Sequence, residues 1–232
     1  MNVQELLADL PKPHGPENAR TDIYRLEDAM FDFLDQRLCR GMKTLELGAG
    51  SSTVIFAIKG TQHTCIVPDQ KQVHRIQEYC HSHQVSLEHV SFILERSQYA
   101  LPEIEQGDFD CILIDGSHGF PSPFVDWYYS ANLLKIGGIV IVDDLHIWTC
   151  STLVDFLREE PEWQLVKETS RTAVFMKMQD GSQNKEWTRQ AYVLHRSRGT
   201  ALLPKLGYAL RLVKQGKLGL LFHNVLSKLA RV

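Results

Sequence analysis

A glycine-rich segment follows a predicted strand in the first quarter of the chain, where a ligand could approach the backbone closely. Leu45 and Leu47 alternate with polar residues, and Gly48-Ala49-Gly50 follows directly. Glycines let a ligand come near the main chain, and a hydroxyl such as that of Ser52 can cap the next helix. The order strand, glycine turn and helix is typical of a nucleotide-binding loop in an open α/β sheet.

Acidic and histidine side chains follow the other predicted strands. Ligands of open α/β sheets bind beyond the carboxyl ends of the strands, so residues at these ends are the candidates for chemistry. Crowded carboxylates repel one another, which predicts a bound cation, a cationic ligand or both. The candidates at strand ends are Glu46, Asp69, Ser97, Gln98, Asp115, His118, Asp143, Asp144 and His146.

The elements that must position these residues alternate between strands and helices. Apolar runs predict seven strands, at residues 44–47, 62–67, 90–94, 109–114, 139–142, 163–167 and 172–177. Apolar residues at helical spacing predict covering helices between them and one N-terminal helix over residues 24–38. This alternation predicts an α/β fold with a doubly wound, Rossmann-like, mostly parallel sheet and helices on both faces. Only a short turn separates the last two strands, so one of them should be antiparallel.

The 232 residues suffice for one α/β domain with appendages. We expect a proline-punctuated arm and covering helix in residues 1–40 and the Rossmann-like domain in residues 41–180. A turn at Gly137-Gly138 should precede the fifth strand. Residues 181–232 should form a basic helical extension, with its leucines at helical spacing between residues 202 and 229.

Charge is distributed unevenly along the chain. Residues 1–180 carry 15 Lys and Arg against 27 Asp and Glu, whereas residues 181–232 carry 10 against 1. A basic extension on an acidic body predicts docking on that body or on a second subunit, or contact with an anionic surface such as a membrane. The first of these is favoured, because glycines within the extension weaken a long continuous helix.

Cysteine usage and hydropathy bear on the compartment. The five cysteines are scattered and odd in number, which indicates reduced, mostly buried thiols. The first residues lack the features of a signal peptide, and no apolar run reaches the length needed to span a bilayer. These features predict a cytoplasmic protein.

Taken together, the motifs resemble those of class I S-adenosylmethionine-dependent methyltransferases. The matching segments are E-L-G-A-G, an acid after the second strand, F-D-C-I-L-I-D-G-S-H, and L-L-K-I-G-G-I-V-I-V-D-D, within residues 40–178. The D-G-x-H and D-D motifs look most like the branch of metal-assisted O-methyltransferases. The resemblance implies a methyltransferase that uses S-adenosylmethionine to methylate a small-molecule or sugar hydroxyl, and it allows for a divalent cation such as Mg²⁺.

The resemblance also implies how the cofactor would be held. Glu46 and the glycine loop would hold its methionine part, and Ser97 and Gln98 would border the adenine. Val67 stands where relatives carry a ribose-binding acid, so Asp69 is the expected substitute, and Ser52 replaces a third glycine. The cofactor-binding set is therefore Glu46, Gly48, Ala49, Gly50, Ser52, Asp69, Ser97, Gln98 and Asp115.

By the same resemblance, Asp115, Asp143 and Asp144 would bind the divalent cation, since all-oxygen ligands suit Mg²⁺. A cation bound to a hydroxyl lowers its pKa, so that a nearby base can remove the proton. His118 is the predicted base because histidine titrates near neutral pH, His146 is the second candidate, and Asp115 completes the catalytic set. Two simpler interpretations stay open. The two adjacent acids could cap a helix, and His118 could merely bond a loop carbonyl.

Three other functions compete with this hypothesis. An NAD-dependent oxidoreductase is disfavoured because Thr53 stands at the position of its third glycine. An aminopropyl-type transferase would keep the cofactor loop, and a scaffold protein would carry a degenerate form of the fold. The expected partners are a small-molecule or glycan acceptor, an anionic or membrane surface for the basic extension, and a second copy in a homodimer. Nucleic acid is not expected, because the body is acidic and has no recognised nucleic-acid motif.

Overall fold

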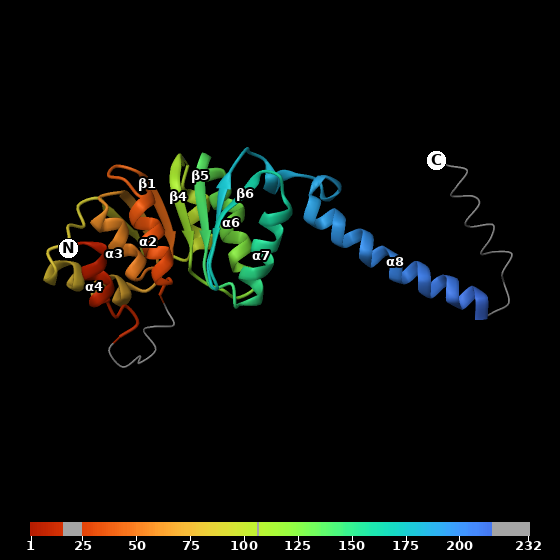
Figure 1. Ribbon diagram of the computed structural model, residues 1–232, viewed down its shortest axis with the longest axis horizontal. Coiled ribbons are helices and arrows are strands. Elements are labelled where there is room, and N and C mark those ends of the chain that lie inside the picture. The colour runs from red at the N-terminus through yellow and green to blue at the C-terminus, as the bar shows by residue number, and fades with distance from the viewer. Residues whose placement is uncertain (16–24, 106, 215–232) are drawn as a thin grey trace. The chain divides into compact units, whose positions relative to one another are not determined.

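The computed structural model describes residues 1–15, 25–105 and 107–214. The chain forms two compact units, residues 1–184 and residues 185–232. The first unit contains a seven-stranded sheet in the order β3-β2-β1-β4-β5-β7-β6 (Figure 1). Its strands are β1 (Lys43–Leu47), β2 (Gln62–Ile66), β3 (Val90–Ile93), β4 (Phe109–Ile114), β5 (Leu134–Val142), β6 (Trp163–Glu168) and β7 (Ala173–Lys177).

The direction of the strands confirms the predicted fold class. The four pairings among β1 to β5 are parallel. Strand β7 runs antiparallel to both β5 and β6, because only a tight turn joins β6 to β7. The start of β7 therefore lies at the same edge of the sheet as the carboxyl ends of β1, β4 and β5.

Two groups of helices cover the two faces of this sheet (Figure 1). On one face, α1, α2 and α3 contact one another, and α3 also contacts α4. On the other face, α6 contacts both α5 and α7. The helices of this unit are α1 (Val3–Ala8), α2 (Asp28–Arg37), α3 (Ser51–Ile58), α4 (Gln70–Ser82), α5 (Ser97–Ala100), α6 (Ser122–Leu133) and α7 (Trp148–Glu159).

A hydrophobic core packs helices α2 and α3 against the central strands of the sheet. Phe31 of α2 and Phe56 of α3 are fully buried and belong to one cluster with Leu113 of β4 and Ile141 of β5. Burying a side chain of this size contributes about 1.5 to 3 kcal/mol. The carboxyl ends of β4 and β5 are thereby fixed beside one another.

The N-terminal residues pack more closely than the proline-punctuated sequence predicted. Val3 and Leu6 of α1 are buried in the same core cluster. The guanidinium of Arg75 on α4 donates a hydrogen bond of 3.0 Å to the carbonyl of Pro13. The described part of the arm is therefore anchored to the body, while residues 16–24, which include the predicted start of the covering helix, lie outside the described residues.

The predicted turn at Gly137-Gly138 is wrong, because both residues lie inside β5. Gly137 has a φ of +82°, a backbone conformation that favours glycine. The register between β4 and β5 shifts where these residues fall. The glycines thus mark an irregularity within a strand and not its beginning.

The second unit contains helix α8 (Ala191–Lys214), which is preceded by the short helix η3 (Trp187–Arg189). The helix begins earlier than the predicted segment 202–229, of which residues 215–229 lie outside the described residues. Within the described ranges, no helix is both long enough and apolar enough to cross a membrane.

Gly48 lies at the closest approach between the loops after β1 and β4. Its φ is +104°, and a side chain there would overlap the carbonyl oxygen of Asp115. The amide of Asp115 in turn donates a hydrogen bond of 3.0 Å to the carbonyl of Leu47. The lack of a side chain at Gly48 therefore allows the two loops to meet.

We predict that Gly48→Ala lowers the free energy of unfolding by about 2 kcal/mol or more, because it adds both backbone strain and an overlap with another main chain. Gly50→Ala is the matched control, since Gly50 has an extended φ of −170° and its added methyl group would meet only the Ser52 hydroxyl at 3.7 Å. Urea unfolding of both variants measures the difference. Equal losses of stability in the two variants would contradict the prediction.

Candidate functional site

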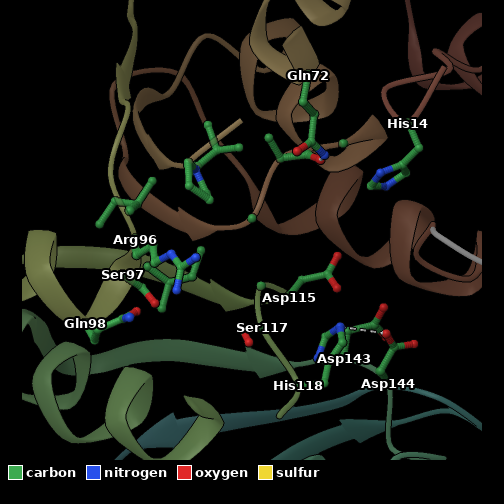
Figure 2. Close-up of a pocket in the computed structure, with 18 of the residues that line it drawn as sticks. His14, Gln72, Arg96, Ser97, Gln98, Asp115, Ser117, His118, Asp143 and Asp144 are labelled. Carbon is green, nitrogen blue, oxygen red and sulfur yellow. Dashed lines mark hydrogen bonds and ion pairs between the residues drawn. The ribbon is translucent and has the colours of Figure 1, made fainter. Parts of the chain in front are cut away.

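A cavity of about 410 Å³ lies at the carboxyl ends of the parallel strands. Figure 2 shows Arg96, Ser97 and Gln98 at one end of it and the His118 ring with several carboxylates at the other. The structure thus brings together most of the residues predicted from strand ends. Those that line the cavity are Gly48, Ala49, Gly50, Ser97, Gln98, Asp115, His118, Asp143 and Asp144.

The glycine loop forms one wall of this cavity and is held by hydrogen bonds on both sides. The amide of Gly48 donates to the carbonyl of Ile66 at 3.0 Å. The side-chain amide of Gln72 donates to the carbonyl of Ala49. Gln72 itself lines the cavity, so α4 both fixes the loop and contributes a polar group.

Glu46 does not line the cavity, although it was predicted to bind the cofactor through the loop. Side chains alternate along a strand, and Glu46 pairs with Leu113 of β4, which packs in the core on the α2–α3 face. Its carboxylate accepts hydrogen bonds from the hydroxyls of Ser52 and Thr53 in α3. Glu46 and Ser52 thus join β1 to the first turn of α3.

A second contact, with His63, stabilises the buried carboxylate of Glu46. Nε2 of His63 lies 3.1 Å from the carboxylate, and the other ring nitrogen lies 2.8 Å from the Thr44 hydroxyl. Cys65, next to this group, donates to the carbonyl of Gly48. Burial and then the charge of Glu46 raise the pKa of the Cys65 thiol well above its usual value. The group therefore supports the loop with a neutral thiol, which is a poor metal ligand.

Asp69 and His146 also lie outside the cavity lining. Asp69 is exposed and caps α4, accepting a hydrogen bond of 2.9 Å from the amide of Lys71. His146 is half exposed, with Nδ1 3.6 Å from the carboxylate of Asp144. The strand-end pattern places both residues at the predicted edge of the sheet, but neither side chain lines the cavity.

Asp144 lies between two cationic groups at the charged end of the cavity. Nε2 of His118 is 3.1 Å from one carboxylate oxygen, and the guanidinium of Arg171 donates to the other at 2.6 Å. Burial alone would raise the pKa of Asp144, but these two bonds outweigh it and lower the pKa to about 2. The bond to Asp144 raises the pKa of His118 to about 10, with a smaller contribution from Cys150.

The other two carboxylates of this end differ in their partners. Asp143 is buried and accepts a hydrogen bond from the hydroxyl of Thr172; burial and the charge of Asp144 raise its pKa to about 6. Asp115 is half-buried, and no group in the described ranges donates a hydrogen bond to its carboxylate. Burial and then the charges of Asp143 and Asp144 raise the pKa of Asp115 well above its usual value.

The position of Arg171 is set by Glu27, which precedes α2. The Glu27 carboxylate accepts hydrogen bonds from the hydroxyls of Thr169 and Ser170 and, at 3.1 Å, from the amide of Arg171. Burial would raise the pKa of Glu27, but these bonds lower it overall. A negative charge outside the cavity thus fixes the β6–β7 turn from which Arg171 reaches Asp144.

Several residues of the cavity were not predicted from the sequence. The signal for Arg171 was present, because an antiparallel last strand brings the preceding turn to the ligand-binding edge. His14 comes from the N-terminal arm, and no strand-end argument points to it. The unpredicted lining residues with polar side chains are His14, Gln72, Arg96, Ser117 and Arg171.

Protein groups already contact two of the three aspartates that were predicted to bind a divalent cation. Asp143 accepts a hydrogen bond from the Thr172 hydroxyl, and Asp144 is bonded to Arg171 and to the His118 ring. Asp115, His118 and Asp144 do place one ligand atom each within 4.8 Å of one another. However, the guanidinium of Arg171 already supplies the positive charge that the crowded carboxylates require.

Comparisons with known proteins agree with the methyltransferase motifs found in the sequence. Residues 45–145 match the model of a family described as a methyltransferase domain. A structure from Staphylococcus aureus, provisionally named a caffeoyl-CoA O-methyltransferase, is similar with a TM-score of 0.59 and 16% identity, covering 76% of this chain and 92% of that one. A structure from Klebsiella pneumoniae, provisionally named an O-methyltransferase, has a TM-score of 0.59 and 15% identity, covering 76% and 95%. No curated protein matches this chain in sequence.

These findings confirm the resemblance to class I methyltransferases, but they overturn the expected partners. An rRNA methylase from Streptococcus thermophilus has the same fold, with a TM-score of 0.52, 12% identity, and coverage of 67% of this chain and 99% of that one. The expectation of a small-molecule or glycan acceptor without nucleic acid is therefore wrong. It relied on the acidic body and on missing nucleic-acid motifs, yet this fold also serves in rRNA methylation.

We predict that His118→Gln lowers the free energy of unfolding by about 1 to 2 kcal/mol at pH 6, after allowance for solvent screening of the partly exposed ring. The raised pKa of His118 means that its contribution is complete below pH 6.5 and is lost as the pH rises to about 10. The lowered pKa of Asp144 means that the contribution of Asp144 is also lost as the pH falls through about 2. Urea unfolding of the variant and the native protein from pH 3 to 10 measures the difference, with His146→Gln as control. A difference that grows toward pH 9 would contradict the assignment.

Proposed function

We propose that the chain is an S-adenosylmethionine-dependent methyltransferase that transfers a methyl group to a hydroxyl oxygen. One observation carries the proposal: within a region that matches a methyltransferase-domain model, the cavity joins a glycine loop, a polar end and Asp115, a carboxylate to which no group in the described ranges donates a hydrogen bond. S-adenosylmethionine supplies a methyl group on a positively charged sulfur. An NAD-type loop would need a glycine at the position of Thr53, whose hydroxyl instead binds Glu46.

The two ends of the cavity suit the two ends of such a cofactor. Ser97 and Gln98 offer neutral hydrogen-bond donors and acceptors for the adenine of the cofactor. They lie on the side opposite to the carboxylates (Figure 2). Asp115 offers a negative charge that no protein donor in the described ranges neutralises, and a cationic ligand would compensate it. In this proposal Gly48, Ala49 and Gly50 let the ligand approach the main chain, while Gln72 holds their loop.

Asp115 is also the group best suited to accept the proton of an acceptor hydroxyl. His118, the base predicted from the sequence, is bonded to Asp144, and its raised pKa of about 10 keeps it protonated near neutral pH. A protonated imidazole cannot take up another proton, although it can orient an oxygen atom. Asp115 lines the same end of the cavity, and burial raises its pKa above the ordinary value, which favours uptake of a proton.

Two exposed aromatic side chains beside the charged end favour an RNA acceptor. Phe120 and Trp148 are 72% and 67% exposed, and their ring centroids are 6.4 Å apart. The pair adjoins the cavity, because Phe120 follows His118 by two residues and the hydroxyl of Thr149 donates to the carbonyl of His118. Exposed aromatic rings stack on unpaired bases. The excess of basic residues in 181–232 is a sequence feature that also suits a phosphate-bearing partner.

The cofactor is tested by calorimetric titration with S-adenosylmethionine, S-adenosylhomocysteine and NAD. We expect micromolar binding of the first two and none of NAD. Asp115→Asn should weaken S-adenosylmethionine about tenfold or more and S-adenosylhomocysteine less, because only the former carries the sulfonium charge and a bond to a charged group contributes about 1.5 to 3 kcal/mol. Lack of binding of both ligands to the native protein would reject the proposed function in favour of a scaffold.

The acceptor is tested with S-adenosylmethionine carrying a tritiated methyl group and deproteinised cell extract. We expect the label in the RNA fraction and its loss after ribonuclease treatment. Trp148→Ala should lower incorporation roughly tenfold, since stacking on one base contributes about 1 to 3 kcal/mol. Tyr128→Ala is the control, an exposed aromatic residue on α6. Label confined to ribonuclease-resistant small molecules would reject the RNA acceptor and leave the cofactor proposal standing.

A further inference from the structure

The charged end of the cavity contains three carboxylates and one arginine, with the ring of His118 beside them. Asp115, Asp143 and Asp144 supply three negative charges in their ionised forms, and Arg171 supplies a permanent positive charge. Arg171 and the His118 ring contact the same carboxylate, that of Asp144. The negative charge that remains therefore lies with Asp115 and Asp143, of which only Asp115 is without a protein donor in the described ranges.

The guanidinium of Arg171 is held where it can compensate this cluster. It donates to Asp144 at 2.6 Å, and the charge of Asp143 acts on it as well. Its main chain is fixed by Glu27 and by a hydrogen bond of 2.8 Å from the Leu145 amide to its carbonyl. An arginine held at both its main chain and its side chain is a permanent positive charge, since it stays protonated in proteins.

A divalent cation at this position would meet two obstacles. It would compete for both oxygens of Asp144, because Arg171 contacts one of them and the His118 ring contacts the other. It would also lie close to the positive charge of Arg171 in a half-buried region, where repulsion is stronger than in water. The backbone of Asp144, with a φ of +58°, holds its carboxylate in this conformation.

We propose that Arg171 takes the place of a divalent cation, so that this chain binds its ligands and orients its acceptor without a metal. The guanidinium neutralises Asp144, the His118 ring contacts the other oxygen of the same carboxylate, and Asp115 stays available to the ligand. Arg171 is thus a positioning residue that acts through Asp144. This inference deepens the proposed function and rests on it for its catalytic meaning, while its test needs no methyl transfer.

The test is a calorimetric titration of the purified full-length protein with Mg²⁺, Mn²⁺ and Zn²⁺ in separate experiments. We expect no saturable binding to the native protein up to about 10 mM Mg²⁺, a concentration about tenfold above the dissociation constants of weak Ca²⁺ sites, which reach about 1 mM. Arg171→Gln removes the guanidinium and leaves Asp115, His118 and Asp144 within 4.8 Å of one another. This variant should bind at least one of the three ions at least tenfold more tightly than the native protein.

Two further variants separate charge from general disruption. Arg171→Lys keeps a positive charge and should bind none of the ions. Arg158→Gln removes a guanidinium that pairs with Glu168 on an exposed surface, at 2.8 Å, and should behave as the native protein. If Arg171→Gln does not fold, the native protein and Arg171→Lys still decide, because saturable binding to either overturns the proposal.

The outcomes are distinct from those of the proposed function. Stoichiometric binding of a cation to the native protein that Asp144→Asn abolishes would overturn the role of Arg171, as would a folded Arg171→Gln variant that gains no binding. A second measurement compares the dissociation constant of S-adenosylhomocysteine with Mg²⁺ and with EDTA, where we expect less than a twofold change. Failure of the protein to bind this ligand under either condition would reject the methyltransferase proposal and leave the cation result valid.

Discussion

The contact of Asp144 with two cations is the interaction on which the charged end of the cavity depends. Three aspartates from two neighbouring strand ends would repel one another without compensation. Arg171 and His118 supply that compensation from different parts of the chain, the β6–β7 turn and the end of β4. Because both cations contact one carboxylate, the compensation is uneven, and Asp115 is left facing the cavity.

The sheet separates residues that support the site from residues that face it. Glu46 and Asp115 both stand at carboxyl ends of neighbouring parallel strands. The alternation of side chains directs Glu46 toward α3, where Ser52, Thr53 and His63 contact it. Asp115 follows the last residue of β4 and belongs to the loop, so its carboxylate enters the cavity. Two acids near the carboxyl ends of neighbouring strands therefore have different environments, because Glu46 lies within β1 and Asp115 lies beyond the end of β4.

The chain shares its fold with a solved structure at only 16% identity. The elements that build the fold can therefore be considered apart from the loops that set the charges of the site. The parallel strands and the glycine loop fix where a ligand binds, and many sequences can build that edge. The loops after β4 and β5 and the turn before β7 decide which charges gather there. In this chain they bring an arginine against Asp144, which sets the electrostatics of this edge without changing the fold.

Sequence patterns were enough to predict the order of strands and helices, the antiparallel strand near the end, the edge of the sheet where the cavity lies and most residues at it. These features follow from local periodicity and from glycine and turn positions, which are properties of neighbouring residues. Only the tertiary structure decided that Glu46 is a buried support, that Gln72, His14 and Arg171 reach the cavity, and that His118 is held as a cation. Glu27 and Arg171 are separated by more than half the chain, and Arg171 and His118 by about 50 residues. No local pattern records such contacts, because their distances and charges exist only once the strands have assembled into the sheet.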